Sequence, residues 1–295
     1  MDRQPAALRR VVPQRKPTSR CVWLVALAAA ISAGSVSAET PAAGSNSRSA
    51  RNDALQAIPL DAMDAEARQK ATTVVNQTSI FRRLPLQVVD CDPRYFIFLL
   101  RHPEVIVSIW KRMDATHMTF ERLGPERFRA EDGAGTVGRI EFLYGDHQTH
   151  VLYAEGAYEG PLTARPVRAN CLLVLRSEYV PHENGRYYIA NQMDMFIDVK
   201  NVGVELIAKT FQNMIGKATD VNFIETANFV SKLSRVTEKN GPGVQRMAAQ
   251  LKGVHAETRQ QFADHANRVY HAAQKRQPGL STTATDARVT RAQDR

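Results

Sequence analysis

The sequence lacks the short motifs that identify many hydrolases, metalloenzymes and nucleotide-binding proteins. It contains no Gly-X-Ser-X-Gly elbow, no paired-cysteine zinc pattern, no His-Glu-X-X-His and no glycine-rich phosphate loop. His147 and His150 lie at a predicted turn beside Asp146, where solvated side chains are favoured over a metal site. We therefore predict no catalytic residue, no metal and no cofactor, and we favour a non-catalytic protein over an enzyme.

The chain also has little net charge once its first residues are set aside. Its 39 Lys and Arg exceed its 30 Asp and Glu, but residues 1–38 hold six of the basic side chains and one of the acidic ones. The remainder carries a net charge near +4. This balance gives no reason to expect a nucleic acid as partner.

Residues 1–38 have the pattern of a cleaved signal peptide. Basic residues from Arg9 to Arg20 precede an apolar run at 21–36 that is too short for a comfortable membrane span. The small residues that end at Ala38 then match a cleavage site. We predict a secreted or periplasmic protein cut before Glu39, and an uncleaved membrane anchor is the alternative.

Two stretches of the remaining chain lack an apolar pattern. Residues 39–52 are small and polar, so we expect a disordered linker over 39–60, and we expect a disordered tail over 275–295. Between them, Asp61 is a candidate N-cap for apolar residues at helical spacing. This pattern predicts an N-terminal helix within 61–83.

From residue 84 the pattern is that of strands, interrupted by one pair of helices. A strand at 84–91 is followed by two short helices, the first capped by Asp92 and divided from the second at His102 and Pro103. Six further strand-like runs, separated by turn signals, lie at 116–123, 127–132, 136–144, 149–158, 167–180 and 187–199. Together these runs predict a seven-stranded antiparallel sheet.

Alternation along these strands predicts one apolar and one polar sheet face. Ile140, Phe142 and Tyr144 share one side of their strand, whereas Arg139 and Glu141 take the other. We expect the polar face to be exposed to water. The apolar face needs a cover.

A helix that begins near Val204 can supply this cover. Its apolar residues recur at helical spacing, and Gly216 and Asp220 make two helices that meet at a kink as good an interpretation as one. A polar helix is predicted at 244–274, with a narrow apolar stripe over 247–269.

This order of elements resembles that of the START-like superfamily, also called helix-grip or SRPBCC-type. The resemblance covers roughly 84–234, within a domain predicted at 84–238, and rests on topology alone. It implies an α+β domain in which a seven-stranded curved antiparallel sheet wraps around a long C-terminal helix, with flanking helices. It also implies a cavity between the sheet and that helix.

The resemblance changes the expectation for the scarce cysteines. Cys21 leaves with the signal peptide, and in an oxidising compartment Cys91 and Cys171 suggest one disulfide. In a helix-grip sheet, however, their strands lie about two strand spacings apart, roughly 10 Å. This separation exceeds the roughly 7 Å Cα limit for a disulfide. The resemblance therefore implies two free, largely buried thiols.

The apolar face supplies a candidate ligand site. Its last strand is rich in methionine, which suits an irregular ligand, yet it carries Asn191. A buried asparagine needs hydrogen-bond partners, which Tyr144 or Ser177 can supply, and an asparagine satisfied within a filled core is the competing interpretation. The predicted ligand-binding residues are Phe142, Tyr144, Leu152, Ala154, Leu173, Leu175, Asn191, Met193, Met195, Phe211, Met214 and Ile215.

Three functional hypotheses follow. The first is an exported, non-catalytic protein that binds a hydrophobic small molecule or lipid in the cavity. The second is a structural or protein-interaction module of the cell envelope with a filled core, which self-associates through 244–274. The third is a cyclase-like or isomerase-like enzyme that polarises a carbonyl with Tyr144, Asn191 and a thiol.

Two basic pairs are candidates for peripheral contact with a membrane. They are Arg82 with Arg83 and Lys111 with Arg112. Each charge contributes only about 1 kcal/mol near anionic headgroups. Ordinary solvated charge is the favoured interpretation for both pairs.

Overall fold

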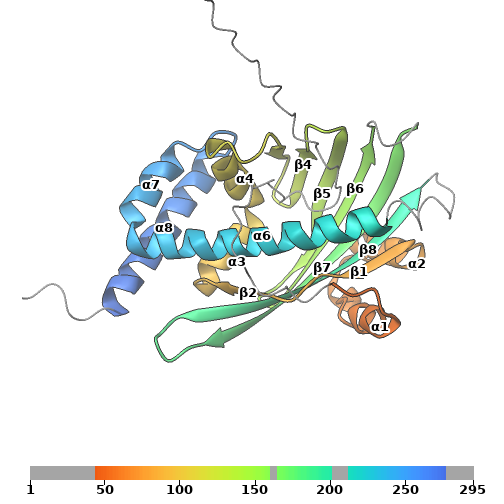
Figure 1. Cartoon of the computed structure of the whole chain (residues 1–295), viewed down its shortest axis with the longest axis horizontal. Helices are drawn as coiled ribbons and strands as arrows, with labels where there is room; N and C mark the ends of the chain where they lie inside the picture. Colours follow the sequence, from red (N-terminus) through yellow and green to blue (C-terminus); the bar gives the residue numbers. More distant parts are fainter. Residues whose placement is uncertain (1–43, 160–164, 201–211, 277–295) are drawn as a thin grey trace, which may run out of the picture.

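The computed structural model describes residues 44–159, 165–200 and 212–276, apart from the side chains of 212–215. These residues form an eight-stranded antiparallel sheet with helices on both of its faces (Figure 1). The strands are β1 (Ile80–Arg83), β2 (Gln87–Asp90), β3 (Thr119–Arg122), β4 (Arg127–Glu131), β5 (Thr136–Gly145), β6 (Thr149–Tyr158), β7 (Val167–Pro181) and β8 (Tyr187–Lys200).

The strand order is β1-β8-β7-β6-β5-β4-β3, with β2 also paired to β8. Ile80 of β1 lies opposite Ile197, and Val89 of β2 lies opposite Ile189, so the two short strands share one edge of the sheet. The predicted strands are all present, and the α+β class is confirmed. β1 follows the helix predicted within 61–83, in a segment for which no strand is predicted, and it forms through cross-strand pairing with β8.

The face that carries α6 (Gln212–Lys239) is called the inner face below. This helix is unbroken and lies across the strands in Figure 1. Two short helices, α3 (Pro93–Arg101) and α4 (Pro103–Arg112), join it in one apolar core, as the sequence predicts. The Asp92 side chain caps α3 by accepting a hydrogen bond from the Tyr95 amide at 3.0 Å. The arrangement matches the predicted helix-grip architecture, a curved antiparallel sheet with a long C-terminal helix across it.

The opposite, outer face is covered along β1, β8 and β7, so the prediction that it faces water is wrong there, whereas Arg129, Arg139 and Glu155 on β4, β5 and β6 are exposed. It packs against α1 (Arg48–Gln56), a 3₁₀ turn η1 (Leu60–Ala62) and α2 (Ala65–Asn76). The linker prediction is therefore wrong over residues 44–60. Its composition misleads because α1 buries only the small side chains of Ala50 and Ala54 and is capped by Ser47.

The N-terminal helix also begins later than predicted. Asp61 lies in η1, and the N-cap of α2 is Asp64, whose carboxylate accepts a hydrogen bond from the Ala67 amide at 2.8 Å. Both aspartates precede a run of good helix formers, so composition alone does not separate them. The local geometry of the 3₁₀ turn decides between the two positions.

The C-terminal region forms two helices where one is predicted. They are α7 (Gly241–Ala249) and α8 (Ala256–Arg276), and the turn between them contains Gly253 with a φ of 72°. A positive φ favours glycine, so this residue breaks the helix. The predicted stripe is buried in the core against α3 and α6, with Phe262 fully buried. It is therefore not a free surface for self-association.

The remaining predictions concern the cysteines and the two ends of the chain. Cys91 and Cys171 are both free and buried, as the resemblance implies. The predicted signal peptide at 1–38 lies outside the described residues, as does the predicted tail from residue 277 on, whereas its first two residues belong to α8. Among the helices that the structure describes, none is both long and apolar enough to cross a membrane.

Candidate functional site

A cavity of about 170 Å³ lies between the inner sheet face and the helices that cover it. Its wall is predominantly apolar, although Asp132, Thr136, Arg139 and Glu155 also border it. The strands contribute Phe120, Phe128, Ile140, Phe142, Leu152, Ala154, Leu173, Leu175, Asn191 and Met193. The helices contribute Phe96, Leu99, Leu100, Pro103, Ile106, Phe223, Thr226, Ala227 and Val230.

Strand alternation explains why these side chains meet. Phe142 on β5 lies opposite Leu152 on β6, which lies opposite Leu173 on β7. Side chains at directly paired positions point to the same face, so this row projects toward α6. Phe223 and Ala227, one helical turn apart on α6, close the cavity from the other side.

Seven of the predicted site residues line this cavity. They are Phe142, Leu152, Ala154, Leu173, Leu175, Asn191 and Met193. Their contact with a ligand stays a prediction. Phe211 lies outside the described residues, and Met214 and Ile215 lie in the first turn of α6, where side chains are not described.

The placement of Tyr144 in the cavity is wrong. The pairing of β5 with β6 shifts register between Phe142 and Tyr144, and this bulge inserts one extra residue. A shift of one residue reverses the direction of the side chains that follow. Tyr144 therefore packs on the outer face, where its hydroxyl donates to Asp146 at 2.7 Å.

Met195 is on the inner face but does not line the cavity. It is fully buried in an adjacent cluster that includes Ile80 and Leu84, which β1 and the segment after it bring to the sheet edge. No strand is predicted at 80–83, so the predicted fold leaves Met195 without this cover. In the structure, Met195 packs against these residues at the sheet edge.

Asn191 has the hydrogen bonds that its burial requires. The Ser177 hydroxyl donates to its Oδ1 at 2.7 Å, which confirms one of the two predicted partners, and its Nδ2 donates to the Ile189 carbonyl at 2.9 Å. The side chain is 2% exposed and borders the cavity. Asn191 is therefore a polar point on an apolar wall.

His150 is a buried residue that the sequence analysis assigns to a solvated turn. It is 1% exposed, lies opposite Leu175 and contacts the ring of Phe142 at a centroid distance of 6.4 Å. Burial lowers its pKa to about 4, and the nearby Arg101 guanidinium lowers it further in the same direction. The imidazole is thus neutral at pH 7, and its Nδ1 has no hydrogen-bond partner in the described structure.

The hypothetical enzyme site is not assembled. Tyr144 and Asn191 face opposite sides of the sheet, and Cys171 does not line the cavity. Burial raises the pKa of the Cys171 thiol, which makes it a poor nucleophile. Among the described residues, no group of three or more His, Cys, Asp or Glu is placed to hold a metal ion.

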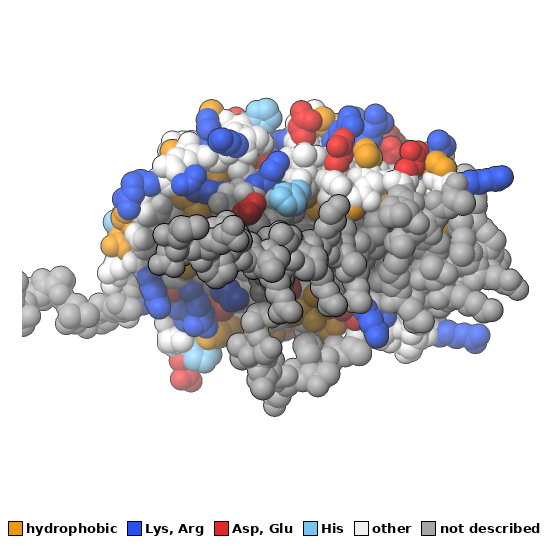
Figure 2. Space-filling model, turned by 45° about the horizontal axis from the view of Figure 1, so that its top comes forward, with side chains coloured by type: hydrophobic (Ala, Val, Ile, Leu, Met, Phe, Trp, Pro, Cys, Tyr) orange, Lys and Arg blue, Asp and Glu red, His pale blue; other side chains and the backbone are white. Residues whose placement is uncertain are grey.

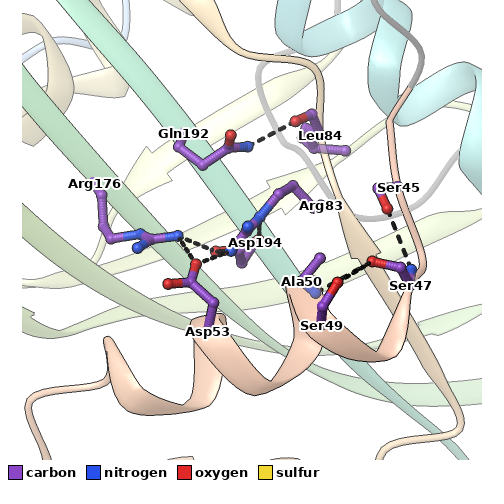
Figure 3. A network of polar contacts seen from close by, with 10 residues as sticks. All are labelled: Ser45, Ser47, Ser49, Ala50, Asp53, Arg83, Leu84, Arg176, Gln192 and Asp194. Carbon is purple, nitrogen blue, oxygen red and sulfur yellow. Dashed lines mark hydrogen bonds and ion pairs between the residues drawn. The ribbon is translucent and has the colours of Figure 1, made fainter.

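The outer face instead carries a buried ion-pair network (Figure 3). Asp194 of β8 is fully buried and accepts hydrogen bonds from Arg83 at 2.7 and 3.0 Å and from Arg176 at 3.1 Å. Arg176 also donates to Asp53 of α1 at 2.8 Å. The network ties α1 to β1, β7 and β8, a role that the sequence analysis does not detect in Asp194.

Ion pairs also engage both arginines of one basic pair that is a candidate for membrane contact. Arg82 pairs with Asp220 of α6, and Arg83 pairs with Asp194, so neither side chain is free to bind headgroups. Lys111 and Arg112 are exposed. Basic and acidic side chains are interspersed on the described part of the face in Figure 2, a pattern that does not favour a ligand of one charge.

No family model and no curated protein matches this sequence. Similar solved structures include a conserved protein from Geobacillus kaustophilus, at 15% identity and a TM-score of 0.36, covering 50% of this chain and 93% of that one. A hypothetical protein from Helicobacter pylori is similar at 16% identity and a TM-score of 0.33, covering 52% of this chain and 89% of that one. The human StarD13 lipid transfer and protein localization domain is similar at 11% identity and a TM-score of 0.28, covering 50% of this chain and 76% of that one. These values are too low to support an inference about function, so the fold assignment rests on this chain's own topology.

Proposed function

We propose that the protein binds a small hydrophobic molecule in the inner cavity and does not transform it. The observation that carries the proposal is the apolar cavity of about 170 Å³. Protein interiors are close-packed and seldom leave voids larger than a water molecule. An engineered apolar cavity of about 150 Å³ stays dry and binds benzene. A comparable space in a natural helix-grip domain is best explained by a ligand.

The volume favours a compact ligand over a two-chain lipid. An aromatic group buries on the order of 200 Å², which contributes about 5 kcal/mol at about 25 cal/mol/Å². That free energy corresponds to a Kd of roughly 0.1 to 1 mM. A ligand with one or two rings therefore gains enough from apolar contact to bind measurably, and polar contacts add to this affinity.

A titration of the full chain with naphthalene, monitored through the fluorescence of naphthalene, tests the proposal. We expect saturable binding of one molecule per chain. Leu173→Phe adds a ring to the cavity wall and is expected to weaken binding by on the order of tenfold, equivalent to about 1.4 kcal/mol. Leu123→Phe is the matched control, because Leu123 is 54% exposed and does not border the cavity.

Absence of saturable binding to the wild-type chain would contradict the proposed function. Equal effects of the two Leu→Phe substitutions would place binding elsewhere on the molecule. Native mass spectrometry of the protein from its producing cell, followed by denaturation, provides an independent readout. A released small-molecule mass would identify the natural ligand directly.

We also propose that the protein acts after export. The basic residues, the apolar run and the small residues of 1–38 support a cleaved signal peptide. N-terminal sequencing of the exported protein is expected to start at Glu39. A protein that keeps residues 1–38 and sediments with membranes would instead support an anchor.

A further inference from the structure

Asn191 uses only half of its hydrogen-bonding capacity within the described structure. A side-chain amide has two donor hydrogens and a carbonyl oxygen with two lone pairs. One hydrogen is donated to Ile189, and one lone pair accepts from Ser177. One donor and one acceptor site remain on a side chain that borders the cavity and is 2% exposed. Each polar atom of Asn191 already has one partner within the protein, and the remaining donor and acceptor sites are available to a ligand that enters the cavity.

The charged residues that line the cavity, Asp132, Arg139 and Glu155, lie on or beside strands at least two positions away from β8, so none of them adjoins Asn191. The guanidinium of Arg101 forms an ion pair with Glu126 and lies over the ring of Phe142, 5.3 Å from its centroid. His150, which packs against the same ring, is neutral because burial lowers its pKa to about 4. A charged ligand group placed here would lose its hydration without gaining a counter-charge.

The cavity-lining residues nearest to Asn191 in the sheet register, Val89, Leu175 and Met193, are apolar. The buried hydroxyl of Tyr179, opposite Ile189, has no hydrogen-bond partner in the described structure, but Tyr179 does not line the cavity. Ser177 already donates its hydroxyl hydrogen to Asn191 and is 4% exposed. A ligand at this end therefore meets a single neutral amide in an apolar surround.

We propose that the ligand is an uncharged apolar molecule with one hydroxyl or carbonyl group, and that Asn191 binds this group. The inference rests on the proposed function and specifies the ligand class for that site. Asn191 then acts as a specificity-determining residue, because it distinguishes a neutral polar ligand from both a pure hydrocarbon and a carboxylate.

Three probes of one ring system test the inference: naphthalene, 2-naphthol and 2-naphthoate. The full wild-type chain at pH 7 is expected to bind 2-naphthol about fivefold more tightly than naphthalene, the effect of one neutral hydrogen bond. It is expected to bind 2-naphthoate more weakly than naphthalene, because the carboxylate is desolvated without a partner.

The double variant Asn191→Leu/Ser177→Ala removes both partners of the buried hydrogen bond, so that no hydroxyl is left unpaired. Its ratio of naphthalene Kd to 2-naphthol Kd is expected to fall to about one, against roughly five for the wild type. Met195→Leu is the matched control on the same strand and face, and it is expected to keep the wild-type ratio. Thermal unfolding of each variant confirms that the chain is folded.

The outcomes separate this inference from the proposed function. If the wild-type chain binds naphthalene and 2-naphthol equally well, the role proposed for Asn191 is wrong and the cavity proposal stands. The same holds if the double variant still binds 2-naphthol more tightly than naphthalene. Tighter binding of 2-naphthoate than of 2-naphthol would likewise overturn the neutral ligand class. If none of the three probes binds the wild-type chain, both proposals fail.

Discussion

Both faces of the sheet carry helices, yet only the inner face borders the cavity described above. On the outer face, α1 and α2 meet the strands through fully buried alanines such as Ala54 and Ala71, so the helices pack closely. On the inner face, α6 crosses the strands while α3 and α4 approach from another direction. Elements that converge from different directions leave space between them, and this space is the cavity.

Two polar residues of β8 show the same contrast. Asp194 faces outward and is fully buried, and both of its oxygens are bound by arginines. Asn191 faces inward, is also buried, and keeps half of its capacity unused. A saturated buried polar group holds the fold together, whereas an unsaturated one beside a cavity is available to a ligand. Burial alone does not separate these roles.

The largest expected effect is on the outer face. Asp194→Asn keeps the size of the side chain but leaves Arg83 and Arg176 with only Asp53 as a counter-charge. Removal of one partner of a buried ion pair typically costs about 3–5 kcal/mol. We expect a loss of this size in the free energy of unfolding, measured by urea titration.

Asp53→Asn is the control for this prediction. The Asp53 side chain is 51% exposed, so its loss is expected to cost at most about 1 kcal/mol. Hydrogen bonds from Arg176 and Arg83 lower its pKa, so its small contribution is lost as the pH falls below the usual aspartate range. Equal losses in the two variants would show that burial of Asp194 does not matter.

The second prediction concerns the acid stability of the inner face. His150 has a pKa of about 4 in the folded state against about 6.5 for an unperturbed histidine, so the unfolded chain takes up a proton first as the pH falls. Stability is therefore full above about pH 6.5 and declines toward pH 4. The loss reaches about 3 kcal/mol, at 1.36 kcal/mol per pKa unit.

His150→Leu is expected to flatten this decline when urea titrations at pH 7 and pH 4.5 are compared. His147→Leu is the matched control, because His147 is exposed on the neighbouring turn. His265, whose pKa burial also lowers to about 4, leaves a residual slope in both variants. A slope in His150→Leu as steep as that of the wild type would contradict the assignment of His150 as a neutral buried residue.

Much of the fold could be predicted from the sequence because its signals are local. Alternation in the later strands, the Asp92 cap and the Pro103 break each act within a few residues. The regions that were missed lack such a signal. β1 depends on pairing with residues more than 100 positions away, and α1 buries alanines that carry little hydrophobic information.

The site was predicted in part for the same reason. Face alternation places Leu173, Leu175 and Met193 correctly, but it fails at Tyr144 because a bulge changes the face without changing the residue pattern. Burial of His150 and of Asp194 depends on which segments cover them. No local pattern in β6 or β8 carries that information.

The last prediction compares one substitution on the two faces. Ala54 on α1 is fully buried between that helix and the sheet, and Ala154 on β6 borders the cavity. Ala54→Leu is expected to cost about 1–3 kcal/mol in the free energy of unfolding, because a close-packed interface has no room for the added methyl groups. Ala154→Leu is expected to change that free energy by less than about 1 kcal/mol, because its new atoms enter open space and gain apolar contacts.

The stability and the naphthalene binding of the two variants together test whether naphthalene occupies open space beside Ala154. Ala154→Leu should retain stability and lose naphthalene binding, since the added atoms occupy the volume that the probe needs. Ala54→Leu should lose stability, and at temperatures where it is still folded it should bind naphthalene like the wild type. If the two variants are destabilised alike, the inner face is as closely packed as the outer one. Asn191 would then be a satisfied structural residue, and the distinction between the two faces would disappear.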